Sequence, residues 1–196
     1  MLSPPSPSLQ ENTIDPRRVG MRLRLTWREW SPMKITMVHD FRYRFDLTAD
    51  ICLLHLESAL SFTNFIDAAA MPDQGQDFPE GSMMTVSGWG STSEGGSVVN
   101  ILQKVDVAVV SDADCDDYYS SFGGIVPEAH ICAGNMPQGG QDSCQGDSGG
   151  PMFEAGGGTV SGIVSWGVGC ARPEFPGVYS QLATYMAWVE ENRQRF

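Results

Sequence analysis

The sequence predicts an all-β domain made of short antiparallel strands, closed by one helix at the C-terminus. Short apolar runs alternate with Gly-rich turns through the second half of the chain, a pattern typical of an antiparallel barrel. These runs cover residues 102–110, 125–133, 159–166 and 177–182. The helix is indicated by residues 185–189, where apolar side chains recur at positions i, i+3 and i+4.

The composition favours a globular protein that works outside the cytosol. The 196 residues are 41% hydrophobic, enough for a core, and the net charge of −12 argues against a nucleic-acid or anionic-membrane partner. No apolar run has the length of a membrane span. The 5 Cys and 3 His include no C-x-x-C pair, so no metal site or cofactor is indicated. We therefore expect disulfides and an extracellular location, although the segment MLSPPSPSLQ lacks the features of a secretory signal.

The first third of the chain predicts a disordered tail followed by three strands. Residues 1–16 are rich in Pro and Ser and have no periodicity, so we expect them to be disordered. Residues 17–29 alternate between apolar and basic side chains, which predicts a half-buried strand. Further strands are predicted at residues 34–39 and 50–56.

An acidic cluster surrounds one cysteine in the second half of the chain. Asp112, Asp114, Asp116 and Asp117 flank Cys115. We expect a solvated loop here. A calcium site is the weaker alternative, because the spacing does not fit an EF-hand loop.

The segment DSCQGDSGGP, residues 142–151, carries the strongest chemical signal. Its simplest interpretation is a Gly-rich turn. However, a serine enclosed by Gly-Asp and Gly-Gly lies on sharply bending backbone, which can present both a hydroxyl nucleophile and neighbouring N–H groups for acyl transfer. The ten residues resemble the nucleophile loop of the trypsin-like members of the chymotrypsin family of serine proteases.

This resemblance extends from Arg17 to Val189 and is strongest from Ser87 onward, where residues 86–90 resemble the SGWG segment that opens the family's second barrel. It implies two antiparallel six-stranded β-barrels of the trypsin type, followed by a C-terminal α-helix. Residues 17–193 would form this peptidase domain. Within it, residues 17–71 would be the remnant of an incomplete first barrel, and residues 72–193 the second barrel and the helix.

The resemblance also implies catalytic roles. Ser148 would be the nucleophile that forms an acyl-enzyme, and the N–H groups of Gly146 and Ser148 would form the oxyanion hole. Asp50, at the head of DICLLHL, would orient the catalytic imidazole. Asp147 would pair with a freed N-terminal amine.

A substrate pocket is implied by the same comparison. Asp142 would lie at its floor and favour Arg or Lys side chains, although a role as a turn cap is the plainer alternative. Residues 165–167, Ser-Trp-Gly, resemble the strand that holds the substrate backbone, and Gly167 with Gly177 would keep the pocket open. The implied partners are peptide or protein substrates with Arg or Lys at the cleavage site, and protein inhibitors that occupy the same cleft.

The cysteines fit this resemblance. It implies two disulfides, Cys115–Cys132 and Cys144–Cys170. Cys52 is left over, and we expect it to be a small core residue. Many relatives have a further disulfide at positions that correspond to Met84 and Glu154, where this chain has no cysteine.

The general-base histidine of the family has no counterpart in the sequence. His39, His55 and His130 all lack the Ala-Ala-His-Cys context of that residue, and we expect His130 to be a surface or loop residue. The chain alone is therefore expected to be inactive. The leading hypothesis is a protease whose N-terminal part is missing here. A catalytically inactive homologue that binds partners through its cleft is the alternative, and a secreted structural module is a third.

Overall fold

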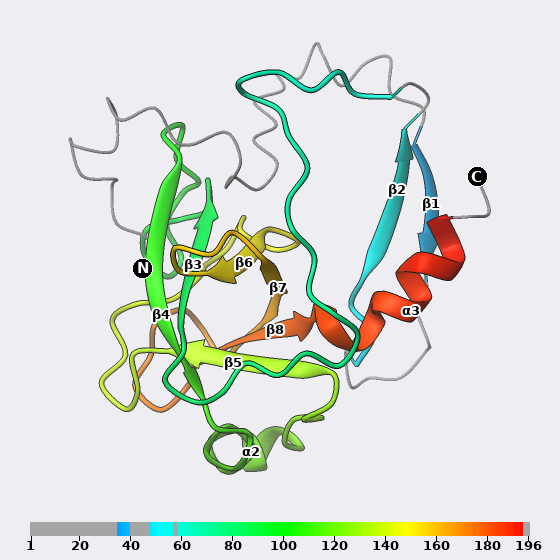
Figure 1. The fold of residues 1–196 in the computed structure, drawn as a ribbon. Helices are drawn as coiled ribbons and strands as arrows, with labels where there is room; N and C mark the ends of the chain where they lie inside the picture. The colour runs from blue at the N-terminus through cyan, green and yellow to red at the C-terminus, as the bar shows by residue number, and fades with distance from the viewer. Residues whose placement is uncertain (1–34, 40–47, 57–58, 194–196) are drawn as a thin grey trace.

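The computed structural model describes residues 35–39, 48–56 and 59–193, which form one closed barrel, a separate pair of strands and two α-helices (Figure 1). The barrel has six antiparallel strands in the order β3-β4-β5-β8-β7-β6, closed by the pairing of β6 with β3. Its strands are β3 Met83–Gly88, β4 Gln103–Val110, β5 His130–Gly134, β6 Pro151–Glu154, β7 Val160–Trp166 and β8 Gly177–Gln181. The predicted barrel and C-terminal helix are confirmed.

Strand β4 alternates between core and solvent over most of its length. In β4, Val105, Val107 and Val109 are buried, whereas Lys104 and Asp106, at alternate positions, are partly or fully exposed. The valines belong to one core cluster with residues of other strands, including Met84 of β3 and Met152 of β6. Strand β6 was not predicted, since its four residues, PMFE, are too few to show periodicity.

The pairing of β3 with β6 places Met84 directly opposite Glu154. These are the two positions at which the resemblance locates a further disulfide in related proteins. Met84 is fully buried and belongs to the barrel core. Packing of a methionine therefore occupies a site where a covalent link would fit the strand register.

The second sheet contains two strands, β1 Ile35–His39 and β2 Cys52–Leu56, paired antiparallel from Ile35 opposite Leu56 to His39 opposite Cys52. Both strands agree with the sequence prediction. A second closed barrel is not found within the described residues, and the predicted strand 17–29 and tail 1–16 lie outside them.

The acidic cluster is a helix, so the prediction of a loop was wrong. Helix α2 spans Asp112–Tyr119 and is followed by the short 3-10 helix η1, Ser120–Phe122. Ser111 caps α2, because its side chain accepts a hydrogen bond of 3.1 Å from the Asp114 N–H. Asp112 and Asp114 lie in the first turn, where the partial positive charge of the helix end favours carboxylates. The Ser-x-x-Asp pattern was the signal for this helix in the sequence.

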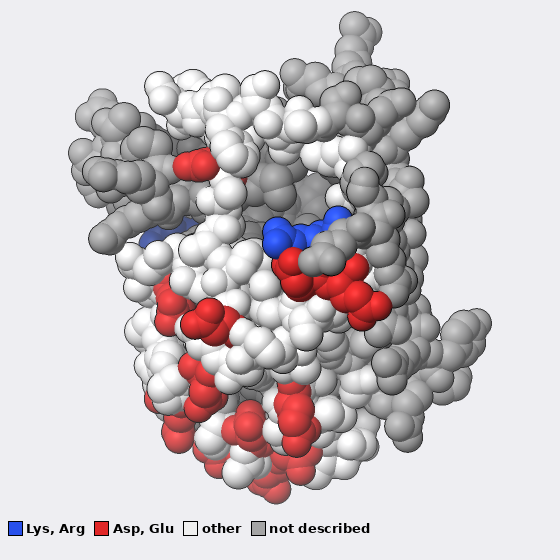
Figure 2. All heavy atoms as spheres, turned by 45° about the vertical axis from the view of Figure 1, so that its right-hand side comes forward, with Lys and Arg blue, Asp and Glu red and all other residues white. Residues whose placement is uncertain are grey.

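Acidic side chains gather over the lower part of the face shown in Figure 2, where few basic side chains are seen. Burial, followed by the negative charges of Asp77 and Glu128, raises the pKa of the Asp112 carboxyl group. No group of three or more acidic, His or Cys side chains in the described segments is arranged to hold a metal ion. Across the same segments, no helix is both long and apolar enough to cross a membrane.

Helix α3, Leu182–Arg193, follows β8 directly and lies beside β2 (Figure 1). Its first turns hold the segment that leads into the barrel: the Gly75 N–H donates to the Ala183 carbonyl at 2.9 Å, and the Gln74 side chain donates to the Thr184 carbonyl at 3.1 Å. The Tyr185 hydroxyl donates to the Thr48 carbonyl. The helix therefore contacts the backbone just before Asp50.

Candidate active site

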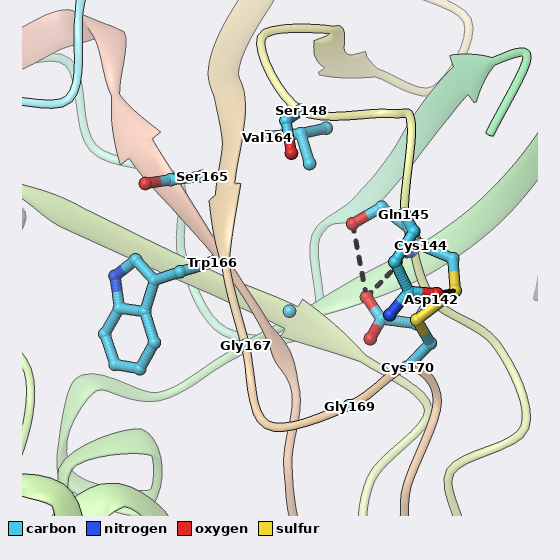
Figure 3. Close-up of a pocket in the computed structure, with 12 residues that line it drawn as sticks. Asp142, Cys144, Gln145, Ser148, Val164, Ser165, Trp166, Gly167, Gly169 and Cys170 are labelled. Carbon is cyan, nitrogen blue, oxygen red and sulfur yellow. Dashed lines mark hydrogen bonds between the residues drawn. A yellow bond between two sulfur atoms is a disulfide. The ribbon is translucent and has the colours of Figure 1, made fainter. Parts of the chain in front are cut away.

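A cavity of about 150 Å³ lies between the loop that follows β5 and the end of β7 (Figure 3). One side consists of residues 142–145 and Ser148, and the other of residues 164–167, 169 and 170, with Gly177 of β8 completing the lining. Ser148 lies toward one end of the cavity and Asp142 toward the other (Figure 3). The residues that the resemblance assigned to the nucleophile and the pocket thus line a single cavity.

Asp142 is a buried carboxylate, 4% exposed. It accepts hydrogen bonds from the Ser143 N–H at 2.8 Å and the Ala171 N–H at 3.0 Å. Burial raises its pKa to about 6, and the two backbone donors partly offset this effect. A Cβ atom on Gly177 would come within 2.4 Å of Asp142 Oδ1, so this position has room only for glycine.

No Lys or Arg in the described residues pairs with Asp142. A cationic ligand in the cavity would remove much of the electrostatic penalty of burying this charge. The charge of Asp142 would therefore favour a positively charged ligand over a neutral one in this cavity.

Ser148 is exposed on a tight turn. The turn is held by hydrogen bonds from the Asp147 N–H to the Cys144 carbonyl, 2.9 Å, and from the Gly150 N–H to the Asp147 carbonyl, 2.8 Å. Gly146 has φ +97°, a conformation that favours glycine. Within the described part of the chain, the N–H groups of Gly146 and Ser148 donate no hydrogen bond, so both are available to a developing oxyanion.

The Asp147 side chain connects the turn that carries Ser148 to Gly90 and Cys144. It is 2% exposed; its Oδ1 accepts the Gly90 N–H at 2.8 Å and its Oδ2 accepts the Cys144 N–H at 3.0 Å. Burial raises its pKa. A Cβ at Gly88 would lie 2.0 Å from this carboxylate, and one at Gly90 would lie 2.5 Å from it, so the glycines of the SGWG segment make room for it. The expected pairing with an N-terminal amine stays a prediction.

Asp50 precedes β2 in the two-stranded sheet, but it contacts two serines of the barrel. Its Oδ2 accepts a hydrogen bond of 2.6 Å from Ser165 Oγ, and its backbone carbonyl accepts one of 2.9 Å from Ser180 Oγ. Ser165 lines the cavity together with Ser148. The fold thus connects Asp50, through Ser165, to the cavity that Ser148 and Asp142 also line.

His130 is not the surface residue that we expected. It lies in β5, is 1% exposed, and its Nδ1 accepts a hydrogen bond of 3.2 Å from the Val126 N–H. Its ring packs edge-on against Trp166, with 5.8 Å between ring centroids. Every residue of β5 is buried, which explains the difference. The side chains of His39 and His55 lie outside the described residues.

Disulfides connect Cys115 of α2 to Cys132 of β5, and Cys144 of the nucleophile turn to Cys170 of the opposite cavity wall. These are the pairs that the resemblance implied. Cys52 is a free, half-buried thiol whose pKa is raised by burial.

Four residues of the site were missed by the sequence reasoning. Ser143 and Ala171 hold the Asp142 carboxylate, whereas Arg172 pairs with Glu94 beside the cavity. Ser143 adjoins a predicted site residue and could have been found on that ground. Glu94 and Arg172 are 78 positions apart, and no local pattern connects them.

Sequence similarity to known proteins covers most of the chain. The Trypsin family profile matches residues 18–189. The chain is 46% identical to Trypsin-1 of Astacus astacus over 81% of its own length and 65% of that protein. It is 41% identical to the vitellin-degrading protease of Bombyx mori over 78% of this chain and 56% of that protein, and 40% identical to Trypsin 5G1 of Aedes aegypti over 72% and 52%. The matched region thus spans between about half and two thirds of these relatives.

Proposed function

Because the chain belongs to the trypsin family of serine proteases, we propose that it carries the site of an endopeptidase that cleaves peptide bonds after Arg or Lys. The observation that carries this proposal is the buried Asp142 carboxylate in the same cavity as Ser148. If the charged side chain of a substrate residue bound Asp142, the backbone carbonyl of that residue would lie near Ser148.

In the proposed reaction, Ser148 Oγ attacks the substrate carbonyl and transfers its proton to an imidazole. The oxyanion that forms accepts hydrogen bonds from the N–H groups of Gly146 and Ser148. The amine leaves with the transferred proton, and water then hydrolyses the acyl-enzyme. Asp50 orients the imidazole, and the hydrogen bond from Ser165 holds Asp50 in place.

No described residue is assigned as the general base. His130 is unsuitable, because it is buried in β5 and its Nδ1 accepts a backbone hydrogen bond. Loss of one member of such a triad lowers turnover by about a millionfold in a comparable enzyme. We therefore expect little or no peptidase activity from this chain alone.

A second candidate function follows from that expectation: a protein that binds cationic segments through the cavity without cleaving them. The pocket residues favour it as much as they favour the protease, whereas the unassigned base favours binding alone. A fluorophosphonate probe separates the two, since rapid stoichiometric labelling of Ser148 would establish a competent protease site. We expect no labelling of this chain.

Selection of a cation can be tested without catalysis. Benzamidinium, a planar cation, should bind the full chain in calorimetric titration. Asp142→Asn should weaken this binding by at least tenfold, because a charge-assisted hydrogen bond in a buried site is lost. Asp106→Asn, which alters an exposed carboxylate on β4, serves as the control. Equal affinities of the Asp142→Asn and Asp106→Asn variants would refute the proposed specificity.

We further propose that the protein functions outside the cell. Two disulfides in a chain of this size are consistent with an oxidising compartment. Peptides or proteins with accessible Arg or Lys would be its substrates or ligands, and proteins that fill the same cavity would inhibit it.

A further inference from the structure

We propose that Glu94 is a positioning residue of the Asp142 pocket, which it serves by bracing the pocket wall through Arg172 and the Cys170 N–H. The inference deepens the proposed function, since the pocket whose affinity it concerns is the cation site described above.

The contacts of Glu94 reach the wall at two points. Arg172 donates to it from both Nε, at 2.8 Å, and Nη2, at 2.5 Å, and the Cys170 N–H donates to Oε2 at 3.2 Å. These donors hold the pKa of Glu94 down at about 2, chiefly through Arg172. The side chain is therefore ionised at any pH at which the pocket binds a cation. A bidentate contact between an arginine and a carboxylate fixes the relative orientation of the two groups as well as their distance.

The ion pair lies directly against the cavity lining. Gly169 and Cys170 both line the cavity. A Cβ on Gly169 would come within 2.3 Å of Arg172 Nε and 2.4 Å of Glu94 Oε2, so the paired groups cover the outer side of this wall residue. Displacement of the pair would release the backbone that the cavity uses as its wall.

Glu94 belongs to a loop, residues 91–95, that also contacts the opposite side of the cavity. The Ser91 N–H donates to the Gln145 carbonyl at 2.8 Å, and the Gly95 N–H donates to Gln145 Oε1 at 3.3 Å. Gln145 lines the cavity next to the nucleophile turn. The loop of residues 91–95 therefore contacts both walls of the cavity. Ser91 and Gly95 bind Gln145 on one wall, and Glu94 binds Cys170 and Arg172 on the other.

Exposed ion pairs contribute little to global stability. Arg172 and Glu94 are 50% and 37% exposed, so we expect their effect in the local geometry of the pocket and not in the melting temperature. A purely electrostatic role makes a different prediction. Removing Glu94 would then weaken cation binding, and removing the positive charge of Arg172 would strengthen it. If the pair instead positions the pocket wall, removal of either Glu94 or the Arg172 charge should weaken cation binding.

The experiment measures benzamidinium affinity of the full chain in the Glu94→Gln and Arg172→Gln variants. Each should bind about fivefold more weakly, and the double variant should be no weaker than either single variant, because both remove the same link. Asp106→Asn breaks the Lys104–Asp106 pair, whose side chains are 39% and 45% exposed, and should leave affinity unchanged. Unchanged or tighter binding by Arg172→Gln would overturn the proposal, as would an equal loss in Asp106→Asn.

Absence of benzamidinium binding by the unaltered chain would refute the cation pocket of the proposed function. The brace is then decided by hydrogen exchange at residues 167–171. Glu94→Gln should exchange these amides several times faster than Asp106→Asn does, whereas equal rates in the two variants would refute the brace.

Discussion

Ser165 Oγ donates a hydrogen bond of 2.6 Å to Asp50 Oδ2 across 115 positions of sequence. This contact joins the two-stranded sheet to the closed barrel at the edge of the cavity. Ser180 and Tyr185 add hydrogen bonds to the backbone carbonyls of Asp50 and Thr48. The second half of the chain thus holds the segment with the acid at three points.

Ser165→Ala should destabilise this junction. Loss of a hydrogen bond to a carboxylate costs about 1–3 kcal/mol, and hydrogen exchange in β2 should become faster. Urea unfolding together with hydrogen exchange measures both effects. Ser97→Ala, at an exposed position, is the control, and an identical response of the two variants would contradict a structural role for the Ser165–Asp50 contact.

Gly177→Ala should damage the pocket. The added Cβ would lie 2.4 Å from Asp142 Oδ1 and 3.0 Å from the Tyr179 hydroxyl, so the carboxylate must move. We expect a loss of about 1–3 kcal/mol in unfolding free energy and at least tenfold weaker benzamidinium binding. For stability, the matched variant is Gly167→Ala, whose Cβ would have no neighbour closer than 3.6 Å and should change unfolding free energy by less than about 0.5 kcal/mol.

Benzamidinium affinity should rise with pH through the pKa of Asp142. Burial raises this pKa to about 6, so the carboxyl group is largely protonated at pH 5 and ionised at pH 7. Titrations between pH 5 and 7.5 should show the increase, and Asp142→Asn should abolish it. An unaltered affinity across this range would show that another group carries the cation site.

The same raised pKa makes a prediction for stability. The folded state retains the Asp142 proton up to about pH 6, whereas the unfolded chain loses it near pH 4. The contribution of this group to stability is thus full below pH 4 and falls as pH rises from 4 to 6, by about 2–3 kcal/mol at most. The difference in unfolding free energy between Asp142→Asn and the unaltered chain should shift in favour of the variant over that interval.

A cross-strand disulfide should form between Met84→Cys and Glu154→Cys. The two positions are direct partners in the β3–β6 pairing. Quantitative loss of two free thiols, measured by mass after alkylation, would verify it. The combination Met84→Cys with Phe153→Cys is the control, because neighbouring residues of a strand point to opposite faces and this pair should stay reduced.

Much of the barrel could be predicted because its signal is local. The alternation in β4 and the glycines that end β3 are visible in the sequence alone. Helix α2 was missed because five of its eight residues are Asp or Cys, which have low helix propensity, and its stability comes from Ser111 and from the packing of Cys115 and Tyr119.

Some residues of the site could likewise be predicted from local sequence, and others could not. Residues of the nucleophile loop are adjacent in sequence, so a motif locates them. The Glu94–Arg172 contact and the burial of His130 depend on how distant strands and loops meet, and neither charge nor spacing indicates this in a single sequence.

The scarcity of basic side chains in the described residues has a further consequence. They contain three: Lys104 within β4, Arg172, and Arg193 at the end of α3. Arg172 precedes Pro173, which has no backbone N–H, and its guanidinium is held by Glu94. Under the proposed specificity, the described residues offer almost no bond that an enzyme of the protein's own kind could cut, so few cleavages should fall within them in a mixture with such an enzyme.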